Sequence, residues 1–299
     1  MAVDYTTTAL VASAKRRGFI PAGSGLSTSD ILQILTEELR NYIPAFLKGI
    51  REEYLVAELE IEVTSPVVQA PTRAVGAAFR AVGWAADGNS YPRPLSRIEP
   101  ERMSGHALTA GEPSGYVFRG NTIILVPGVS SGTIVLAYQQ RPGQLVLPSD
   151  CAEVTAILGS TVTVAAKPTA FDDDTVFDFV SAAPNFTATA LDYNADGLEA
   201  VWTGNDVVLT AAGAALLSVG DYLCAAGETP IPQIPIEVHD LLAQAGALKM
   251  AQAQGSSRLD AIAQGLADLR AQLTVILSPR SDGSARPIIS RSRIGAGAW

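Results

Sequence analysis

The stretch Leu259–Ile276, LDAIAQGLADLRAQLTVI, carries the clearest pattern in the chain. Its large apolar side chains are separated by three or four residues, which places them on one face of a helix. The positions between them hold mainly Ala, Gln, Asp, Arg and Thr, so only one face calls for burial. We therefore predict an amphipathic helix that needs a packing partner. This packing stripe consists of Leu259, Ile262, Leu266, Leu269, Leu273 and Ile276.

A second helix is predicted directly before this one, over Glu237–Gln254, because its apolar residues follow the same spacing. Pro235 lies just before its first turn, where a missing N–H costs little. Gly255-Ser256-Ser257 marks a kink or a tight connection between the two helices. The packing stripe contacts other helices of the same chain, another subunit, or both, since a lone amphipathic helix is not stable.

The N-terminal part is also predicted to be helical. A first helix over Thr6–Arg17 ends at Gly18, with basic residues in its last turn. Ser27 and Asp30 form the pattern of a capping box, and a wide apolar face follows. Pro44 marks a kink or the start of a further helix that continues to Leu55.

From Glu58 to Val63 the apolar period changes from that of a helix to that of a strand, which predicts a strand or the end of a helix that unwinds into one. A short helix or turn is predicted around Val75–Trp84, and strand-like runs then follow as far as Pro232. Gly120-Asn121 and Gly159-Ser160 are predicted to form tight hairpin turns. The fold class expected is α+β, a helical bundle of N- and C-terminal helices with an inserted, mainly antiparallel β module. Four parts are expected. The N-terminal helices of the helical core span residues 1–63, and the inserted β-rich module spans 64–232. The C-terminal helices of the core span 233–278, and an extended C-terminal arm spans 279–299.

The composition limits the possible functions. The chain has 299 residues, a net charge of −9, 47% hydrophobic residues and only 17% charged residues. So low a charged fraction favours a protein whose flanks are covered by neighbours. An acidic body argues against general nucleic-acid binding, although a DNA duplex can pass such a surface without adhering to it.

The sequence predicts neither a membrane segment nor a secretory leader, because it has no apolar run of the required length. We therefore expect assembly in the cytoplasm. Cys151 and Cys224 lack metal-like spacing, and two buried free thiols are favoured over a disulfide.

Candidate chemistry is sparse. Asp172-Asp173-Asp174 is the best candidate for a calcium site, but its spacing matches no EF-hand loop, and a solvated hairpin tip is favoured. His106 and His239 lack the spacing and partners of a zinc site. Gly128–Gly132 reads G-x-S-S-G between two strands, where a hairpin loop explains it. We predict no catalytic residue, cofactor or metal, and hence no enzyme.

The segment Pro279–Trp299 is the richest candidate for binding. It holds four Arg against one Asp, and around residue 288 it alternates charged and apolar side chains. Such a segment suits addition to a partner as an extended peptide, whereas a solvated tail would have little use for its apolar residues. We therefore favour a tether over a disordered tail.

Five stretches together resemble a known family. They are STSDILQILTEELRNYIPAFLKGIREEY (27–54), GYVFRGNTIILVPG (115–128), VLAYQQRPGQLV (135–146), PIPQIPIEVHDLLAQAGALKMAQAQG (230–255) and ILSPRSDGSARPIISRSRIGAGAW (276–299). In this order they resemble the head-to-tail adaptor, or connector, proteins of short-tailed bacteriophages. The stretch Ala165–Ser218 matches no pattern of that family.

The resemblance implies a structural virion protein at the head–tail interface. Copies of the chain would form a ring, usually of twelve, beneath the portal protein, and prolong the DNA channel. Genomic DNA would pass through without sequence-specific binding, and tail nozzle or tail-fibre proteins would dock below. The resemblance places the portal-binding arm at Arg280, Arg286, Ile288, Ile289, Arg291, Arg293 and Trp299.

Two other functions compete with this interpretation. One is a tail nozzle or fibre-attachment protein, in which the β part would dominate. The other is a virion-associated hydrolase, which would depend on His106, His239 or a pair of carboxylates.

Overall fold

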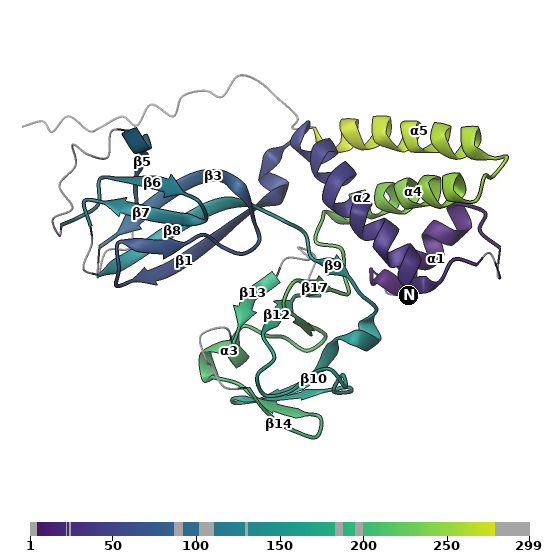
Figure 1. Cartoon of the computed structure of the whole chain (residues 1–299). Helices are drawn as coiled ribbons and strands as arrows, with labels where there is room; N and C mark the ends of the chain where they lie inside the picture. The colour runs from purple at the N-terminus through teal and green to yellow at the C-terminus, as the bar shows by residue number, and fades with distance from the viewer. Residues whose placement is uncertain are drawn as a thin grey trace, which may run out of the picture.

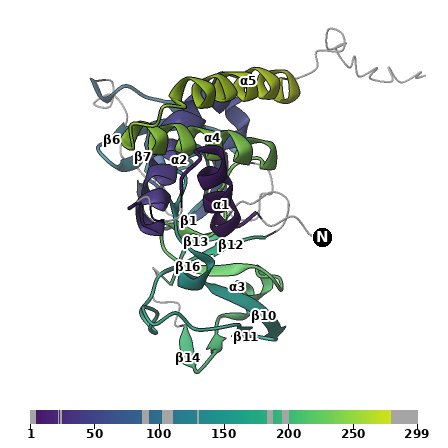
Figure 2. The ribbon, with the colours of Figure 1, turned by 90° about the vertical axis from the view of Figure 1, so that its right-hand side faces the viewer.

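The computed structural model describes residues 5–21, 23, 25–86, 92–101, 111–128, 131–182, 188–194 and 200–278. These residues form three packed parts, which are a helical layer, a β sandwich and a curled seven-stranded sheet (Figure 1). The seven-stranded sheet lies below the helical layer in both views (Figure 2), and the β sandwich lies to the left of both in Figure 1. None of the helices within the described ranges is both long and apolar enough to cross a membrane.

The helical layer comes from both ends of the described chain. It contains α1 (Thr7–Arg17), α2 (Thr28–Lys48), α4 (Ile236–Ala253) and α5 (Leu259–Leu277). One apolar core joins them, and fully buried residues of α2 form its centre. Helices α2 and α4 approach closely at Gly246, where an added Cβ would lie 2.5 Å from Leu35 Cδ2.

The start of α2 is fixed by the capping box that the sequence predicts. The Ser27 hydroxyl accepts a hydrogen bond from the Asp30 N–H at 3.1 Å, and the Asp30 carboxylate accepts one from the Ser27 N–H at 2.9 Å. The helix continues through Pro44 and ends at Lys48. The predicted helical continuation to Leu55 is wrong, because Gly49 follows as the cap and a single 3-10 turn, η1 (Glu52–Leu55), leads into the first strand.

The β sandwich consists of two four-stranded sheets around one core. The first sheet has the order β1 (Val56–Val63), β8 (Gly132–Gln140), β3 (Ala74–Ala85) and β4 (Arg93–Pro94). The second has the order β2 (Val67–Gln69), β7 (Thr122–Val126), β6 (Gly115–Arg119) and β5 (Ser96–Arg97). Strand β1 lies at an edge of the first sheet. It pairs with β8 on one side, and no described strand pairs with its other side.

The third part is the seven-stranded sheet. Both ends of it contribute to one core with Phe177 and Phe179 at its centre, so the sheet curls around this core. A short helix, α3 (Ala211–Ala215), packs there through Ala214. The strand order is β13 (Ala188–Tyr193), β12 (Phe177–Val180), β16 (Tyr222–Ala225), β10 (Ala152–Leu158), β11 (Thr161–Val164), β15 (Asp206–Val208) and β14 (Val201–Thr203).

A small parallel ladder lies where the parts meet. It pairs β9 (Gln144–Leu145) with β17 (Glu228–Thr229), and a 3-10 turn, η3 (Pro148–Asp150), follows β9. Helix α2 is tied to this ladder because the Leu145 N–H donates to Thr36 Oγ1 at 3.1 Å.

The predicted helical bundle with one inserted β module is wrong. The structure is an α+β mix that is mostly β-rich, with only five α-helices among the described residues. The strands form two separate bodies with separate cores instead of one module. Residues 75–84, predicted as a short helix or turn, belong to strand β3, because pairing with β8 and burial of Val82 and Trp84 outweigh the helix propensity of the alanines.

Candidate functional site

The packing stripe of the C-terminal helix lies on α5. Ile262 and Leu273 are buried, and Leu266 and Leu269 are half-buried against the helical core. Leu259 packs with Ile262 in a small separate cluster against α4. Ile276 is instead 65% exposed, and the neighbouring Leu277 takes the buried position. At the C-terminal end of α5 the buried face therefore includes Leu277 in place of Ile276.

The opposite face of α5 is exposed, and its charged residues are Asp260, Asp268 and Arg270. Helix α5 is the outermost helix of the layer, and α4 lies directly beneath it (Figure 1). Its exposed end carries Val275, which is 79% exposed, beside Ile276. Adjacent exposed apolar side chains are one sign of a contact surface, whereas singly scattered ones are normal on a protein surface. The exposed residues of α5 are Asp260, Ala261, Ala263, Gln264, Ala267, Asp268, Arg270, Ala271, Gln272, Thr274, Val275 and Ile276.

The segment 279–299 lies outside the described residues. Its predicted arm residues Arg280, Arg286, Ile288, Ile289, Arg291, Arg293 and Trp299 therefore stay a prediction. The described chain ends at Ser278, directly after the exposed apolar end of α5.

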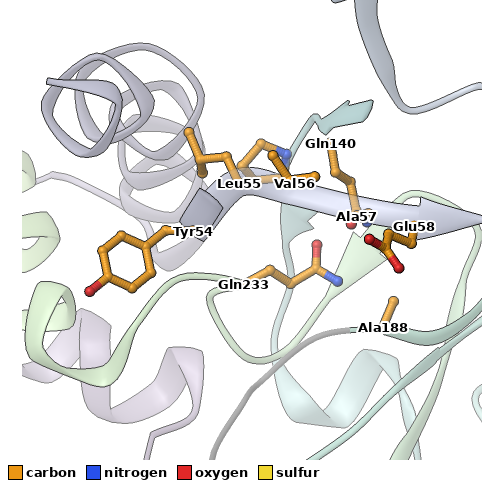
Figure 3. Close-up of a pocket in the computed structure, with 9 residues that line it drawn as sticks. Tyr54, Leu55, Val56, Ala57, Glu58, Gln140, Ala188 and Gln233 are labelled. Carbon is orange, nitrogen blue, oxygen red and sulfur yellow. The ribbon is translucent and has the colours of Figure 1, made fainter. Parts of the chain in front are cut away.

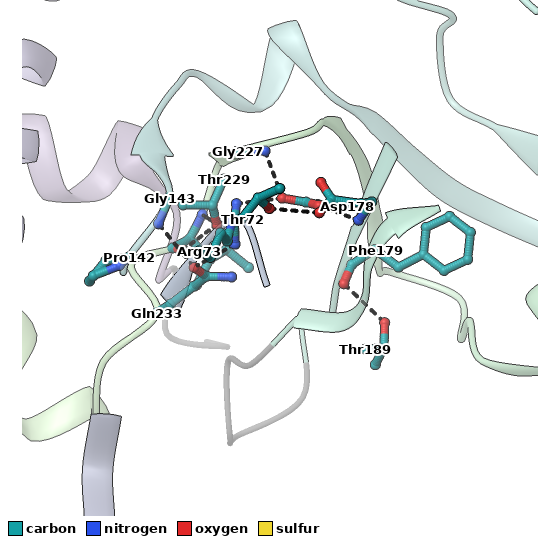
Figure 4. Close-up of polar contacts among 12 residues, drawn as sticks. Thr72, Arg73, Pro142, Gly143, Asp178, Phe179, Thr189, Gly227, Thr229 and Gln233 are labelled. Atoms are coloured by element: carbon teal, nitrogen blue, oxygen red, sulfur yellow. Dashed lines mark hydrogen bonds and ion pairs between the residues drawn. The ribbon is translucent and has the colours of Figure 1, made fainter. Parts of the chain in front are cut away.

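A buried polar junction joins the three parts of the molecule (Figure 4). Arg73, directly before β3, forms an ion pair with Asp178 of β12, and both side chains are buried. The Asp178 carboxylate also accepts hydrogen bonds from the N–H groups of Asp192 at 3.0 Å and Gly227 at 2.8 Å. Burial raises the pKa of Asp178, while Arg73 and the two N–H groups oppose that shift.

Gln233 connects this junction to the segment that leads into the helices. Its Oε1 accepts a hydrogen bond from the Gly143 N–H at 3.1 Å and lies 3.5 Å from Arg73 Nη1. An added Cβ at Gly143 would lie 3.2 Å from Arg73 Nη2 and 3.2 Å from the Gly227 carbonyl oxygen. Glycine therefore lets the backbone approach the ion pair closely.

A pocket of about 290 Å³ lies beside the junction (Figure 3). The Nε2 atoms of Gln140 and Gln233, two of its lining residues, are buried without a hydrogen-bond partner among the described residues. Glu58 and Tyr54 also line it. The pocket therefore lies beside two unsatisfied amide groups, and Gln233 links it to the junction.

The remaining candidates for metal binding are the acidic run 172–174 and the two histidines. In the acidic run, Asp172 accepts a hydrogen bond from Thr175 Oγ1 at 2.7 Å, and Asp173 accepts one from the Trp202 N–H at 3.0 Å. His239 packs edge-on against Tyr5 at 5.9 Å between ring centroids, and burial lowers its pKa. His106 lies outside the described residues. The described part of the chain holds no group of three or more metal-ligating side chains.

The two cysteines lie together on neighbouring strands. Both are buried and free. The register pairs Ala152 with Leu223, which makes Cys151 and Cys224 the next cross-strand pair. Burial raises the pKa of Cys224, and the hydrogen bond with Cys151 acts in the same direction. These thiols therefore fit a packing role.

No protein-family model matches the chain, and no curated protein matches it.

Proposed function

We propose that the chain is a head-to-tail adaptor of a short-tailed bacteriophage, a structural virion protein that forms a ring under the portal. The observation that carries the proposal is the exposed face of α5, which ends in the apolar Val275 and Ile276 directly before the basic segment 279–299. The resemblance of five ordered stretches to that family supports the same assignment.

The proposed mechanism is mechanical. The helical layer would face the portal and the neighbouring subunits, since it carries α5 at its surface (Figure 1). The seven-stranded sheet, which lies below the helical layer in both views, would point toward the tail. The net charge of −9 would keep the channel wall from holding the DNA that passes it. Arginines of the arm would make bidentate contacts with portal carboxylates or backbone carbonyl groups.

The test is cryo-electron microscopy of the full chain with and without the portal ring of the same virus. We expect a ring seated on the portal, with density for residues 279–299 running between portal subunits. A variant that ends at Ser278 should stay folded and lose portal binding. A full-length variant with glutamine at Arg280, Arg286, Arg291 and Arg293 separates the effect of charge from that of length. Portal binding by the truncated chain would contradict the proposal.

A tail nozzle or fibre-attachment protein is the second candidate, and the β-rich fold favours it. One row of cross-strand neighbours on the seven-stranded sheet is unusually apolar for its exposure. Leu158 is 84% exposed in this row, and Val201 and Val208 are each more than 40% exposed. Such a row suits contact with another β protein. Trimers or six-fold assemblies that do not bind the portal would favour this candidate.

A further inference from the structure

A cationic cleft lies between helix α2 and the end of strand β8. Its volume is about 420 Å³. Arg40 and Lys48 line it from α2, and Arg141 lines it from the residue that follows β8. Leu55 and Val75 add apolar surface, and Val75 is 42% exposed. No carboxylate is among its lining residues, although the chain as a whole is acidic.

The three cations of this cleft lack carboxylate partners within the described chain. None of Arg40, Lys48 and Arg141 takes part in a salt bridge with a described residue. Arg40 is held in place because its Nε donates to the Pro142 carbonyl oxygen at 3.3 Å. Desolvation and the charges of Arg141 and Arg73 lower the pKa of Arg40, and Arg73 is already paired with Asp178. The cleft therefore carries an unbalanced positive charge that an anionic group would stabilise.

The edge strand β1 carries a row of side chains of the opposite charge. Glu58, Glu60 and Glu62 are exposed, and they alternate with Leu59 and Ile61, which pack on the sandwich core. The three carboxylates therefore share one face, with successive side chains about 6.6 Å apart along the strand. None of them forms a salt bridge with a described residue. Directly opposite on β8 they meet only small or apolar residues, Ala137, Val135 and Thr133.

We infer that the cationic cleft receives the acidic face of strand β1 from a second copy of this chain. The cleft offers three cations and an apolar floor, and the strand offers three carboxylates beside small side chains. Both features are unpaired within the described chain, so a contact between copies would neutralise both at once. Arginine suits this contact, because its guanidinium binds a carboxylate through two parallel hydrogen bonds.

The contact joins two different surfaces, so it is heterologous. Repetition of a heterologous contact gives a closed ring or an open filament, depending on the rotation between copies. The inference names the subunit contact of the proposed ring and in that sense rests on the proposed function. The contact itself can be measured without a portal.

The experiment uses two full-length charge-reversal variants. The cleft variant carries Lys48→Glu and Arg141→Glu, and the strand variant carries Glu60→Lys and Glu62→Lys. All four residues are exposed, so both variants should fold, as circular dichroism melting would verify. Arg119→Glu and Glu153→Lys are matched controls, because both residues are exposed and lack salt bridges with described residues. Sedimentation velocity over concentrations up to about 1 mM then measures self-association.

The wild-type chain should self-associate, and raising NaCl from about 50 mM to about 500 mM should weaken this association. Each variant alone should associate at least about 30-fold more weakly, because like charges then face each other. An equimolar mixture of the two variants should associate again, since each reversed patch finds an opposite charge on the other variant. The control variants should behave as the wild type does.

Three outcomes would overturn the inference. They are a wild-type chain that stays monomeric at every concentration, variants that associate as well as the wild type, and a mixture that fails to recover. A portal-bound ring that is insensitive to both reversals would retain the proposed function and reject this contact. Charge-dependent assembly by a chain that ignores the portal would retain the contact and reject the adaptor function.

Discussion

Asp178 is the residue on which the joining of the three parts depends most. It is fully buried, and it binds Arg73 together with two backbone N–H groups from other segments. Removing one partner of a buried ion pair leaves the other charge uncompensated. We therefore expect Asp178→Asn to lower the free energy of unfolding by about 3–5 kcal/mol. Urea denaturation followed by tryptophan fluorescence would measure the change.

The control for this substitution is Asp240→Asn. Asp240 pairs with Arg17 at 2.6 Å, but its side chain is 64% exposed. Loss of an exposed pair should change the free energy of unfolding by less than about 1 kcal/mol. Equal effects of the two substitutions would mean that the Arg73–Asp178 pair contributes no more than a surface ion pair does.

His239 should make the stability of the protein depend on pH. Burial lowers the pKa of the folded imidazole below the ordinary value of 6.5. The unfolded chain therefore binds a proton first as the pH falls, and the free energy of unfolding should decrease from about pH 6.5 down to the folded pKa. Hydrogen bonds to the backbone of Ile234 and Pro232, and the charges of Asp240 and Glu237, oppose this shift without reversing it.

The comparison that isolates His239 uses His239→Phe, which keeps a ring against Tyr5. Denaturation at about pH 7.5 and about pH 5.5 gives the loss of stability for each protein. The variant should lose less stability than the wild type between these two values. An identical loss in both proteins would assign the pH dependence to other groups.

At the scale of elements, the crossing of α2 and α4 depends on one glycine. Gly246 is in contact with Leu35, which is fully buried, and no space remains for a Cβ. We expect Gly246→Val to force the two helices apart and to lower the free energy of unfolding by about 1–3 kcal/mol. Thermal melting followed by circular dichroism would measure this.

Ala263→Val on α5 is the matched control, since Ala263 is exposed on a helix of the same layer. It places the same side chain in a helix without forcing a clash, so its effect should be limited to the small loss of helix propensity. A Gly246→Val variant as stable as this control would show that the helices repack without cost.

Local elements were predicted well where the signal lies in neighbouring residues. The sequence predicts the first helix to within one residue at its start, the capping box at Ser27, and both glycine hairpin turns. These features depend on hydrogen bonds between residues close in the chain. Strand β3 was missed because its alanines favour a helix locally, while its pairing partner β8 begins 47 residues after Ala85.

The polar junction could not be predicted from the sequence for a related reason. Arg73 and Asp178 are 105 positions apart, and Arg73 and Gln233 are 160 apart. No periodicity or motif marks any of the three residues, so only the assembled fold brings them together. The cationic cleft was missed similarly, since Arg40 and Arg141 meet only where the residues after β8 contact α2. Most of the stripe on α5 was predictable because its residues are neighbours on one helix, but Ile276 is exposed and Leu277 is buried instead.

At the scale of the whole molecule, α5 and the segment after it should contribute differently to stability. Helix α5 buries Ile262, Leu273 and Leu277 against the rest of the helical layer. Ending the chain at Ser257 should remove these contacts and lower the free energy of unfolding by on the order of 5 kcal/mol. Ending it at Ser278 should change that free energy by less than about 0.5 kcal/mol, because the proposed arm serves a partner.

The two truncations together test whether residues 279–299 contact their own subunit or a partner. If the chain that ends at Ser278 loses stability, residues 279–299 pack on their own subunit, and the proposed portal contact would first have to displace them. If it keeps its stability and loses portal binding, the arm acts on the partner alone. The Ser257 truncation is the positive control, because a measurement that misses the removal of three buried side chains could not detect a smaller contribution from the arm.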